Sequence, residues 1–343
     1  MKLLFIGGTG LISSACSELA VARGHDLYLL NRSTSTKYLP PKEATVLQAD
    51  IHVDETHLTD LLAGHRFPGT LRWGFDAVVD FIAFTVEDIE RDIRLFRGKT
   101  ERFVFISSAS AYQKPPKHYF ITEKTPLENP FWLYSRNKIA CEERLMKAFD
   151  EESFPVTIIR PSHTYGPSQI PLCVGSWRHP WTVIDRMKRG GKVIVPGDGT
   201  SLWVLTWNDD FAKGLVGLLG NEKAIGEAFQ ITSDEVLTWN QIHLEIYAAL
   251  GLESKIVHIP SDLITAHDPE KLGTLIGDKA NSVVFDNSKI KSFVPDFTCD
   301  VKWPEGLHRS LKWFEEDPSR QTIDDEMNIM WDKIISAYEK AMP

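Results

Sequence analysis

The sequence Lys2-Leu-Leu-Phe-Ile6, followed at once by Gly7-Gly-Thr-Gly-Leu-Ile-Ser13, decides the fold of this chain. The first stretch is an apolar run typical of a buried strand, and apolar residues then recur at helical spacing over Leu11–Arg23. A strand, a glycine-rich turn and a helix form the context in which such glycines bind a dinucleotide. Gly7 and Gly10 permit a tight turn and close approach of the backbone to a pyrophosphate, whose charge then lies at the helix N-terminus. The predicted contacts of this turn with the cofactor are Gly7, Gly8, Thr9, Gly10, Leu11 and Ile12.

The composition is that of an ordinary globular protein. The chain has 343 residues, of which 43% are hydrophobic and 25% charged, and this size favours one or two domains. The formal net charge of −9 comes without a basic block, so nucleic acid and an anionic membrane surface are not expected partners. Four scattered cysteines predict neither a disulfide framework nor a metal site. No apolar run has transmembrane length and the first strand leaves no room for a signal peptide, so we expect a cytoplasmic protein.

Apolar stretches of strand length alternate with amphipathic stretches of helical length through the first half of the chain. The strand-like runs after the first are Asp26–Leu30, Thr45–Gln48, Asp76–Ala83, Arg102–Ile106 and Val156–Ile159. Helical spacing occurs between them, at Glu55–Ala63, Val86–Phe96 and Phe131–Phe149. This alternation predicts an α/β fold with a Rossmann-type, doubly wound parallel sheet.

The rhythm changes after Arg160-Pro161, where prolines break the chain into shorter pieces. We expect a Rossmann domain over residues 1–165 and a smaller C-terminal α/β substrate-binding domain, with C-terminal helices, over residues 166–343. Leu202–Thr206 and Ala228–Ile231 are expected to return to the first sheet as added strands, so segments near 202–232 belong with the first domain. Helices are expected at Asp209–Leu219, Trp239–Leu250, Pro304–Glu316 and Asp324–Met342.

The end of the second strand-like run bears on which dinucleotide binds. An NAD-binding unit carries an acidic residue here to hold the ribose hydroxyls, but this chain has Asn31 and Arg32, followed by Ser33-Thr-Ser-Thr36. Asn31 cannot repel a 2′-phosphate, and Arg32 with the hydroxyls could bind one, which favours NADP(H) over NAD(H). In the alternative interpretation Arg32 points into solvent and Asn31 binds the ribose of NAD.

Tyr134-Ser-Arg-Asn-Lys138 lies in the first turns of a predicted helix. The i, i+4 spacing places the phenol and the ammonium on one face, about 5–6 Å apart at Cβ. A phenol titrates near a pKa of about 10, and a neighbouring ammonium together with an oxidised nicotinamide favours the phenolate. Serine hydroxyls at the end of the preceding strand could bind the substrate oxygen whose charge changes. These serines are Ser107, Ser108 and Ser110.

Taken together, these motifs resemble the extended short-chain dehydrogenases/reductases, in the branch of the NAD-dependent epimerases and dehydratases. The resemblance covers most of residues 1–250, and its motifs are specific jointly rather than singly. Besides the glycine turn it rests on Asp50-Ile51, Asp80-Phe-Ile-Ala83, Ser107-Ser-Ala-Ser-Ala-Tyr112, Tyr134-x-x-x-Lys138, Arg160-Pro161, Tyr165-Gly-Pro167, Gly197-Asp-Gly199 and Asp209-Asp-Phe211.

The resemblance implies a role for individual residues. Tyr134 would be the acid/base, and Lys138 would lower its pKa and bind the nicotinamide ribose. Ser108 would hold the substrate hydroxyl or carbonyl, with Ser110 as the second candidate. Asp50 and Ile51 would contact adenine. The implied cofactor contacts beyond the glycine turn are Asn31, Arg32, Asp50, Ile51, Phe81, Ile82, Ala83, Ser107, Tyr134, Lys138, Pro161 and His163.

The chain departs from the family pattern at positions that concern the substrate. Ser13 replaces the last glycine of the turn and is small enough to keep helix and strand close. Ala109 stands where 4,6-dehydratases carry an acidic pair, which disfavours elimination of water. Trp203 stands where sugar-nucleotide members carry an arginine for the diphosphate, and an indole can stack on a sugar or an aromatic ring but cannot replace a bidentate clamp.

Three further residues are candidates for substrate binding, with alternatives left open. His163, where related enzymes often carry asparagine, either binds substrate or is a hydrogen-bonded core histidine. Trp177 and Trp181, four residues apart, belong either to the core or to the pocket. Since Arg178, Arg186 or Lys188 could bind phosphates instead of the missing arginine, a nucleotide sugar remains a possible substrate.

The expected function is that of an NAD(P)-dependent oxidoreductase or epimerase acting on a secondary alcohol or ketone of a sugar or glycoside. The alternatives are an NADPH-dependent reductase of a non-sugar ketone, and a non-catalytic relative that binds NAD(P) or RNA. Intact Tyr134 and Lys138 disfavour a non-catalytic sensor, and the acidic charge disfavours RNA. We expect a monomer or homodimer whose partner is a small-molecule substrate.

Overall fold

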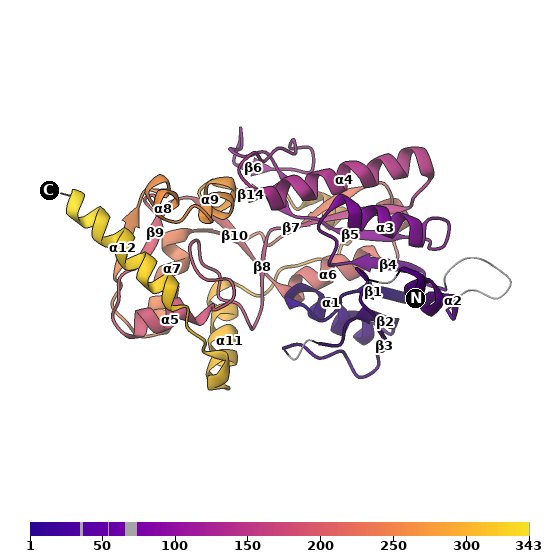
Figure 1. Ribbon diagram of the computed structural model, residues 1–343, viewed down its shortest axis with the longest axis horizontal. Coiled ribbons are helices and arrows are strands. Elements are labelled where there is room, and N and C mark those ends of the chain that lie inside the picture. Colours follow the sequence, from indigo (N-terminus) through magenta and orange to yellow (C-terminus); the bar gives the residue numbers. More distant parts are fainter. Residues whose placement is uncertain (35–36, 54, 66–73, 343) are drawn as a thin grey trace.

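A seven-stranded parallel sheet organises the N-terminal half of the computed structural model, which describes residues 1–34, 37–53, 55–65 and 74–342 (Figure 1). Its strand order is β11-β7-β5-β4-β1-β2-β3, so the chain winds outward in both directions from β1 and β4. The predicted Rossmann-type doubly wound sheet is confirmed. The strands are β1 (Lys2–Ile6), β2 (Asp26–Asn31), β3 (Thr45–Gln48), β4 (Ala77–Asp80), β5 (Phe103–Ile106), β7 (Val156–Pro161) and β11 (Ala228–Ile231).

Helices cover both faces of this sheet because its strands are apolar on both sides. One face is covered by α1 (Leu11–Ala22), α6 (Asn208–Leu218) and α10 (Ser288–Phe293), which bury Ala15, Leu215 and Ile290 against it. The other face is covered by α2 (Glu55–Ala63), α3 (Val86–Phe96) and α4 (Leu133–Glu152). Within the described residues, no helix combines the length and the apolar character that a membrane span requires.

The C-terminal half folds around its own apolar core, at the end of the molecule away from β1 to β5 (Figure 1). Its sheets are small: β10 (Leu202–Trp207) lies between β8 (His163–Tyr165) and β12 (Val236–Thr238), and β9 (Val193–Pro196) pairs with β13 (Ile256–Ile259). The helices around this core are α5 (Trp181–Lys188), α7 (Trp239–Ala249), α8 (Ser261–His267), α9 (Lys271–Thr274), α11 (Trp303–Glu315) and α12 (Asp325–Ala341).

One further pairing connects distant parts of the chain. The two-residue strands β6 (Phe120–Ile121) and β14 (Val284–Phe285) pair in parallel, Phe120 opposite Val284. This pairing carries the segment before β14, including a π-helix at Leu275–Lys279, to the loop that follows β5.

Two later segments were expected to join the large sheet as added strands, and this prediction is wrong for one of them. Ala228–Ile231 lies at the edge of the large sheet beside β7, but Leu202–Thr206, within β10, lies in the separate sheet with β8 and β12. The apolar run of β10 is buried there as thoroughly as it would be in the large sheet, so hydrophobicity alone did not distinguish the two locations.

Candidate active site

A cavity of about 910 Å³ opens at the carboxyl ends of the parallel strands. Residues after β1, β2, β4, β5 and β7 line one side, and residues from the C-terminal half line the other. This is the position where open α/β sheets bind ligands, beside the point at which the strand order reverses. The volume lies at the upper end of the range typical of ligand pockets, about 300–1,000 Å³.

The glycine turn has the backbone that a dinucleotide requires. Gly7 and Gly8 have φ values of +106° and +87°, which L side chains rarely adopt. A Cβ on Gly8 would lie 2.6 Å from Cδ2 of Leu29, so only glycine lets the turn pass this close to β2. Ser13 is 3% exposed, and its hydroxyl accepts the Gly10 N–H at 2.8 Å. The serine therefore fits in place of the family glycine and ties the turn to α1.

The residues after β2 form a compact turn of their own. The Asn31 side-chain oxygen accepts hydrogen bonds from the backbone N–H of Ser33 at 2.8 Å and from its hydroxyl at 3.2 Å. The Arg32 guanidinium lies 3.9 Å from Asp50, with its side chain 67% exposed. All four residues line the cavity. Arg32 thus lies at the rim, paired with the residue expected to contact adenine; Thr36, from the same expected polar loop, lies outside the described residues.

Tyr134 lines the cavity together with Ser108 and Ser110. The Ser108 side chain interacts with the Tyr134 phenol. The hydroxyls of Ser108 and Ser110 are 2.9 Å apart, and that of Ser135 donates to Ser110 at 2.8 Å. Burial raises the pKa of Tyr134, the interaction with Ser108 lowers it, and the charge of Asp278 raises it. Lys138 is not among the causes of this shift; burial dominates it, and the phenol is protonated near neutral pH.

The ammonium group of Lys138 lies near Tyr134 and is bound by two backbone carbonyl oxygens. Its Nζ donates to the carbonyl oxygens of Ala83 and Ile106, both at 2.7 Å, and lies 5.8 Å from the centre of the Tyr134 ring. Burial lowers its pKa to about 8, so the ammonium form persists at neutral pH. An ammonium has three N–H donors, and the two carbonyls use two of them.

A buried ion-pair network fixes the loop that holds Lys138. One carboxylate oxygen of Asp80, at the end of β4, accepts the backbone N–H of Ile82 at 2.6 Å and of Ala83 at 2.9 Å. Its other oxygen lies 3.4 Å from Arg91 of α3, which also donates to Asp92 at 2.8 Å. Burial and the nearby Asp80 raise the pKa of Asp92 well above its usual value.

Ser107 plays a different part from its neighbours. Its hydroxyl donates to Glu142 of α4, which forms a buried two-pronged ion pair with Arg160 at the end of β7, through N···O contacts of 3.0 and 2.6 Å. Ser107 is 2% exposed, and its hydroxyl is used in the bond to Glu142. Ser107 therefore connects strand β5 to α4 and does not present a free hydroxyl to a ligand.

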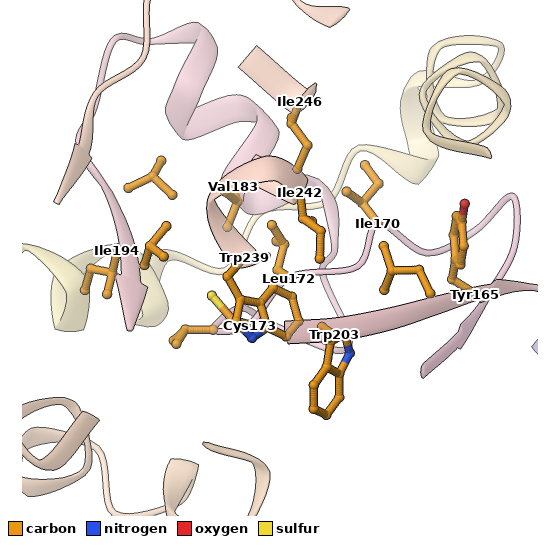
Figure 2. Packing of buried hydrophobic residues seen from close by; sticks show 14 of the residues in the cluster. Tyr165, Ile170, Leu172, Cys173, Val183, Ile194, Trp203, Trp239, Ile242 and Ile246 are labelled. Carbon is orange, nitrogen blue, oxygen red and sulfur yellow. The ribbon is translucent and has the colours of Figure 1, made fainter. Parts of the chain in front are cut away.

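His163 and Trp203 form a hydrogen-bonded pair at the far wall. The Trp203 indole N–H donates to Nδ1 of His163 at 3.2 Å, which leaves the proton of a neutral ring on Nε2. Burial, with a smaller contribution from Lys279, lowers the pKa of His163 to about 3, so the ring is neutral. Trp203 is 2% exposed and stacks on Trp239 with ring centres 5.4 Å apart, as Figure 2 shows. Trp203 thus orients His163, and because it also lines the cavity, its stacking on a substrate stays a prediction.

Trp177 and Trp181, the other two candidate tryptophans, lie in different surroundings. Trp177 is 66% exposed at the mouth of the cavity, whereas Trp181 is 3% exposed and packs on Phe314, with ring centres 5.3 Å apart. Trp181 therefore belongs to the C-terminal core and not to the substrate site. Its helical spacing relative to Trp177 could not reveal this, because α5 begins only at Trp181.

Most of the remaining predicted residues line the cavity, including Phe81, Ile82, Pro161 and Ile51. Gly8 and Ala83 do not reach its surface, and they act through the backbone turn and the Lys138 bond described above. The sequence reasoning missed several lining residues, for which no motif gave a signal. These are Phe84, Lys114, Trp132, Thr274, Asp278, Lys279, Val283 and Phe285.

The basic residues suggested as substitutes for the missing arginine lie elsewhere. Arg186 is bonded to Asp332 of α12, and Lys188 lies 3.5 Å from Glu315 of α11. Neither lines the cavity, nor does Arg178, whereas Lys114 and Lys279 do.

Comparison with known proteins gives relatives of several activities. A UDP-N-acetyl-alpha-D-glucosaminuronate decarboxylase of Bacillus cytotoxicus is 24% identical over 338 residues, covering 92% of this chain and 98% of the relative. A chloroplast stem-loop binding protein of 41 kDa from Arabidopsis thaliana is 29% identical over 263 residues, covering 75% and 65%. A UDP-glucuronic acid 4-epimerase of Bacillus cereus, solved with UDP-glucuronic acid and NAD, has the same fold, with a TM-score of 0.71 at 18% identity over 92% of this chain and 99% of that one.

The fold and its cavity define the class of the protein: an enzyme of the extended short-chain dehydrogenase/reductase type. A model of the NAD dependent epimerase/dehydratase family matches residues 3–232, and the chain belongs to this family. The resemblance read from the motifs is thereby confirmed, and so is NAD as the cofactor of the family.

Proposed function

We propose that this enzyme oxidises a secondary alcohol of a sugar, which is part of a nucleotide sugar or a glycoside, to a ketone. It then either reduces this ketone from the opposite face, which inverts the configuration of the carbon, or releases it. The observation that carries the proposal is that Tyr134, Ser108 and Lys138 line one cavity with the glycine turn, with Nζ of Lys138 5.8 Å from the centre of the Tyr134 ring. The uronate-processing relatives support a sugar nucleotide as substrate.

The residues around Tyr134 divide the work on the substrate oxygen. In the direction of oxidation, Tyr134 acts in its phenolate form, which the positive charges of Lys138 and of bound NAD would favour. The phenolate accepts the proton of the substrate hydroxyl, and Ser108 donates a hydrogen bond to the same oxygen. Bound NAD supplies the oxidising equivalent. Ser110 and Ser135 orient Ser108 through their hydroxyl contacts, so they act as positioning residues.

Lys138 has two tasks in this scheme. Its charge favours loss of the proton from Tyr134, against the burial that raises the tyrosine pKa. Its third N–H is available to a ribose hydroxyl of the cofactor, while Ala83 and Ile106 hold the other two. Gly7 and Gly8 have positive φ and no side chains, so the backbone of the turn could approach the pyrophosphate of a dinucleotide.

The test of the proposal has two parts. Freshly purified protein is denatured and the released nucleotide is identified by absorbance and mass. NAD(H) retained in stoichiometric amount supports an epimerase, which regenerates its cofactor each turnover. A site that binds the nucleotide reversibly supports a dehydrogenase or reductase. Protein that binds neither NAD nor NADP contradicts the proposal.

Tyr134→Phe then tests the acid/base. We expect turnover of UDP-sugars to fall by about three orders of magnitude or more, because the variant loses the general acid–base group. The affinity for NAD should stay within about twofold of the parent value. Tyr119→Phe, at a tyrosine that is 52% exposed, is the matched control and keeps full activity. Turnover of Tyr134→Phe within a factor of a few of the parent would remove Tyr134 from this role.

A second candidate function is suggested by the stem-loop binding relative. It is disfavoured by the net charge of −9, because RNA binding depends on cationic contacts with phosphate. Steeply salt-dependent retention on immobilised RNA would favour this candidate, and retention that is negligible at every salt concentration would exclude it.

A further inference from the structure

Lys114 is a buried cation in the wall of the cavity. The residue follows the Ser107–Tyr112 motif by two positions and is 3% exposed. Its Nζ lies 3.6 Å from Oδ1 of Asp278, which the π-helix at Leu275–Lys279 presents to the same space. Burial lowers the pKa of Lys114, and the Asp278 carboxylate raises it.

Lys279 adds a second cation beside the same carboxylate. Its Nζ lies 3.9 Å from Oδ2 of Asp278, and its side chain is 15% exposed. The charge of Lys279 contributes to lowering the pKa values of both Lys114 and His163, so its field reaches both residues. Two ammonium groups therefore share one carboxylate, at distances longer than those of good charge-assisted hydrogen bonds, about 2.7–2.9 Å.

Within the part of the chain that the structure describes, Asp278 is the carboxylate paired with both lysines, so two positive charges meet one negative charge here. A buried charge is stabilised only when it is paired and hydrogen-bonded, so an anionic ligand at this point would satisfy what Asp278 leaves incomplete. We propose, on the basis of the function proposed above, that Lys114 and Lys279 form a subsite for an oxyanion of the substrate, a carboxylate or a phosphate.

The location assigns the subsite to the substrate rather than to the cofactor. Asn129 bonds the carbonyls of both Ser110 and Gly277, the residue before Asp278, and this places the cluster near Ser108 and Ser110 in the cavity lining. The pyrophosphate of a dinucleotide is instead expected at the glycine turn, which belongs to the first strand–helix unit of the large sheet. The lysines thus take over the task for which the arginine is missing at Trp203.

A purely structural role for the lysines is less consistent with the contacts. The segment that carries Asp278 is already tied to the loop after β5 by Asn129, whose side-chain amide donates to the carbonyl of Ser110 at 2.9 Å and of Gly277 at 2.8 Å. Fixing the segment does not require two lysines aimed at one carboxylate.

The test is a binding experiment by calorimetry on NAD-loaded protein, with UDP-glucuronic acid, UDP-glucose and UDP as probes. The variants are Lys279→Met, Lys114→Met and the charge-preserving Lys114→Arg. Lys188→Met serves as matched control, because Lys188 also has one carboxylate partner but lies outside the cavity. Thermal unfolding of each variant identifies any that fails to fold, and Lys279→Met, at the more exposed lysine, keeps the test open in that case.

The pattern of affinities distinguishes the two sources of the oxyanion. If it is a carboxylate, UDP-glucuronic acid binds about tenfold more tightly than UDP-glucose, and Lys279→Met abolishes this preference. If it is the diphosphate, all three probes lose about tenfold in affinity in Lys279→Met and not in Lys188→Met.

Two results would overturn the subsite: unchanged affinities in both methionine variants, or no binding of any of the anionic probes to the parent protein. The first result leaves the Tyr134→Phe test of the proposed function standing, since turnover does not depend on this subsite. The second leaves the identification of the released nucleotide standing, since that experiment concerns the cofactor.

Discussion

At the scale of single residues, hydrogen bonds decide which atoms of the cavity donate and which accept. The indole N–H of Trp203 donates a hydrogen bond to Nδ1 of His163. The neutral imidazole therefore has its proton on Nε2 and can only donate to a ligand from that nitrogen. The asparagine that related enzymes often carry at this position also has a donor, but the indole–imidazole pair fixes one orientation. His163 is therefore suited to donate to a substrate oxygen over the whole physiological pH range.

Arg32 carries a prediction about cofactor choice at the same scale. Its guanidinium is mostly exposed and lies 3.9 Å from Asp50, so a 2′-phosphate can compete for it at little cost. We expect Arg32→Ala to weaken NADPH binding about tenfold and NADH binding no more than about twofold, as measured by fluorescence titration. Equal losses for both nucleotides would mean that Arg32 does not contact a 2′-phosphate.

At the scale of elements, α3 offers two arginines in contrasting surroundings. Arg91 is buried between Asp80 and Asp92, and Arg94, one turn further, is exposed and pairs with Glu55. The first pairing supports the loop that holds Lys138, while the second joins two helices at the surface.

Removal of the two cations is expected to have unequal effects. Arg91→Met leaves buried carboxyl groups without a counter-charge and should lower the free energy of unfolding by about 3–5 kcal/mol. Arg94→Met removes an exposed pair and should cost about 1 kcal/mol or less. Urea denaturation of both variants measures the difference, and equal small losses would mean that the Asp80 network does not carry stability.

The secondary-structure elements show which features of the fold and of the site could be predicted from the sequence and which could not. The bounds of α3 and β3 were predicted to the residue, because local apolar periodicity and flanking polar residues specify them. The approach of Lys279 to Lys114 was not predictable, since it depends on the pairing of β6 with β14 across nearly half of the chain. Tyr134, Lys138 and Ser108 could be predicted to share one cavity, because Ser108 follows a strand end of the parallel sheet and the other two share one face of the next long helix.

At the scale of the whole molecule, a buried histidine couples stability to pH. His243 of α7 is fully enclosed, with Nδ1 2.8 Å from the Trp239 carbonyl, and burial lowers its pKa to about 4. The unfolded chain has the ordinary value, about 6.5, and so binds the proton first as the pH falls. The free energy of unfolding should therefore decrease between about pH 6.5 and pH 4, by at most about 1.4 kcal/mol per pH unit for this group.

His243→Gln tests this coupling. The variant should show a shallower decrease of unfolding free energy over that pH interval, whatever its stability at neutral pH. His308→Gln, at an exposed position on α11, should keep the slope of the parent. An unchanged slope in His243→Gln would mean that other groups account for the acid sensitivity.

The order of strands in the large sheet has a consequence for how the chain acquires its structure during synthesis. The edge strand β11 and the covering helices α6 and α10 come from after residue 200, although the strands that they complete are all made before residue 162. A nascent chain that has emerged only as far as β8 exposes the edge of β7 and the apolar side of β1. The two halves are thus interleaved rather than consecutive, and we expect that a polypeptide ending near residue 165 would aggregate instead of yielding a stable nucleotide-binding fragment.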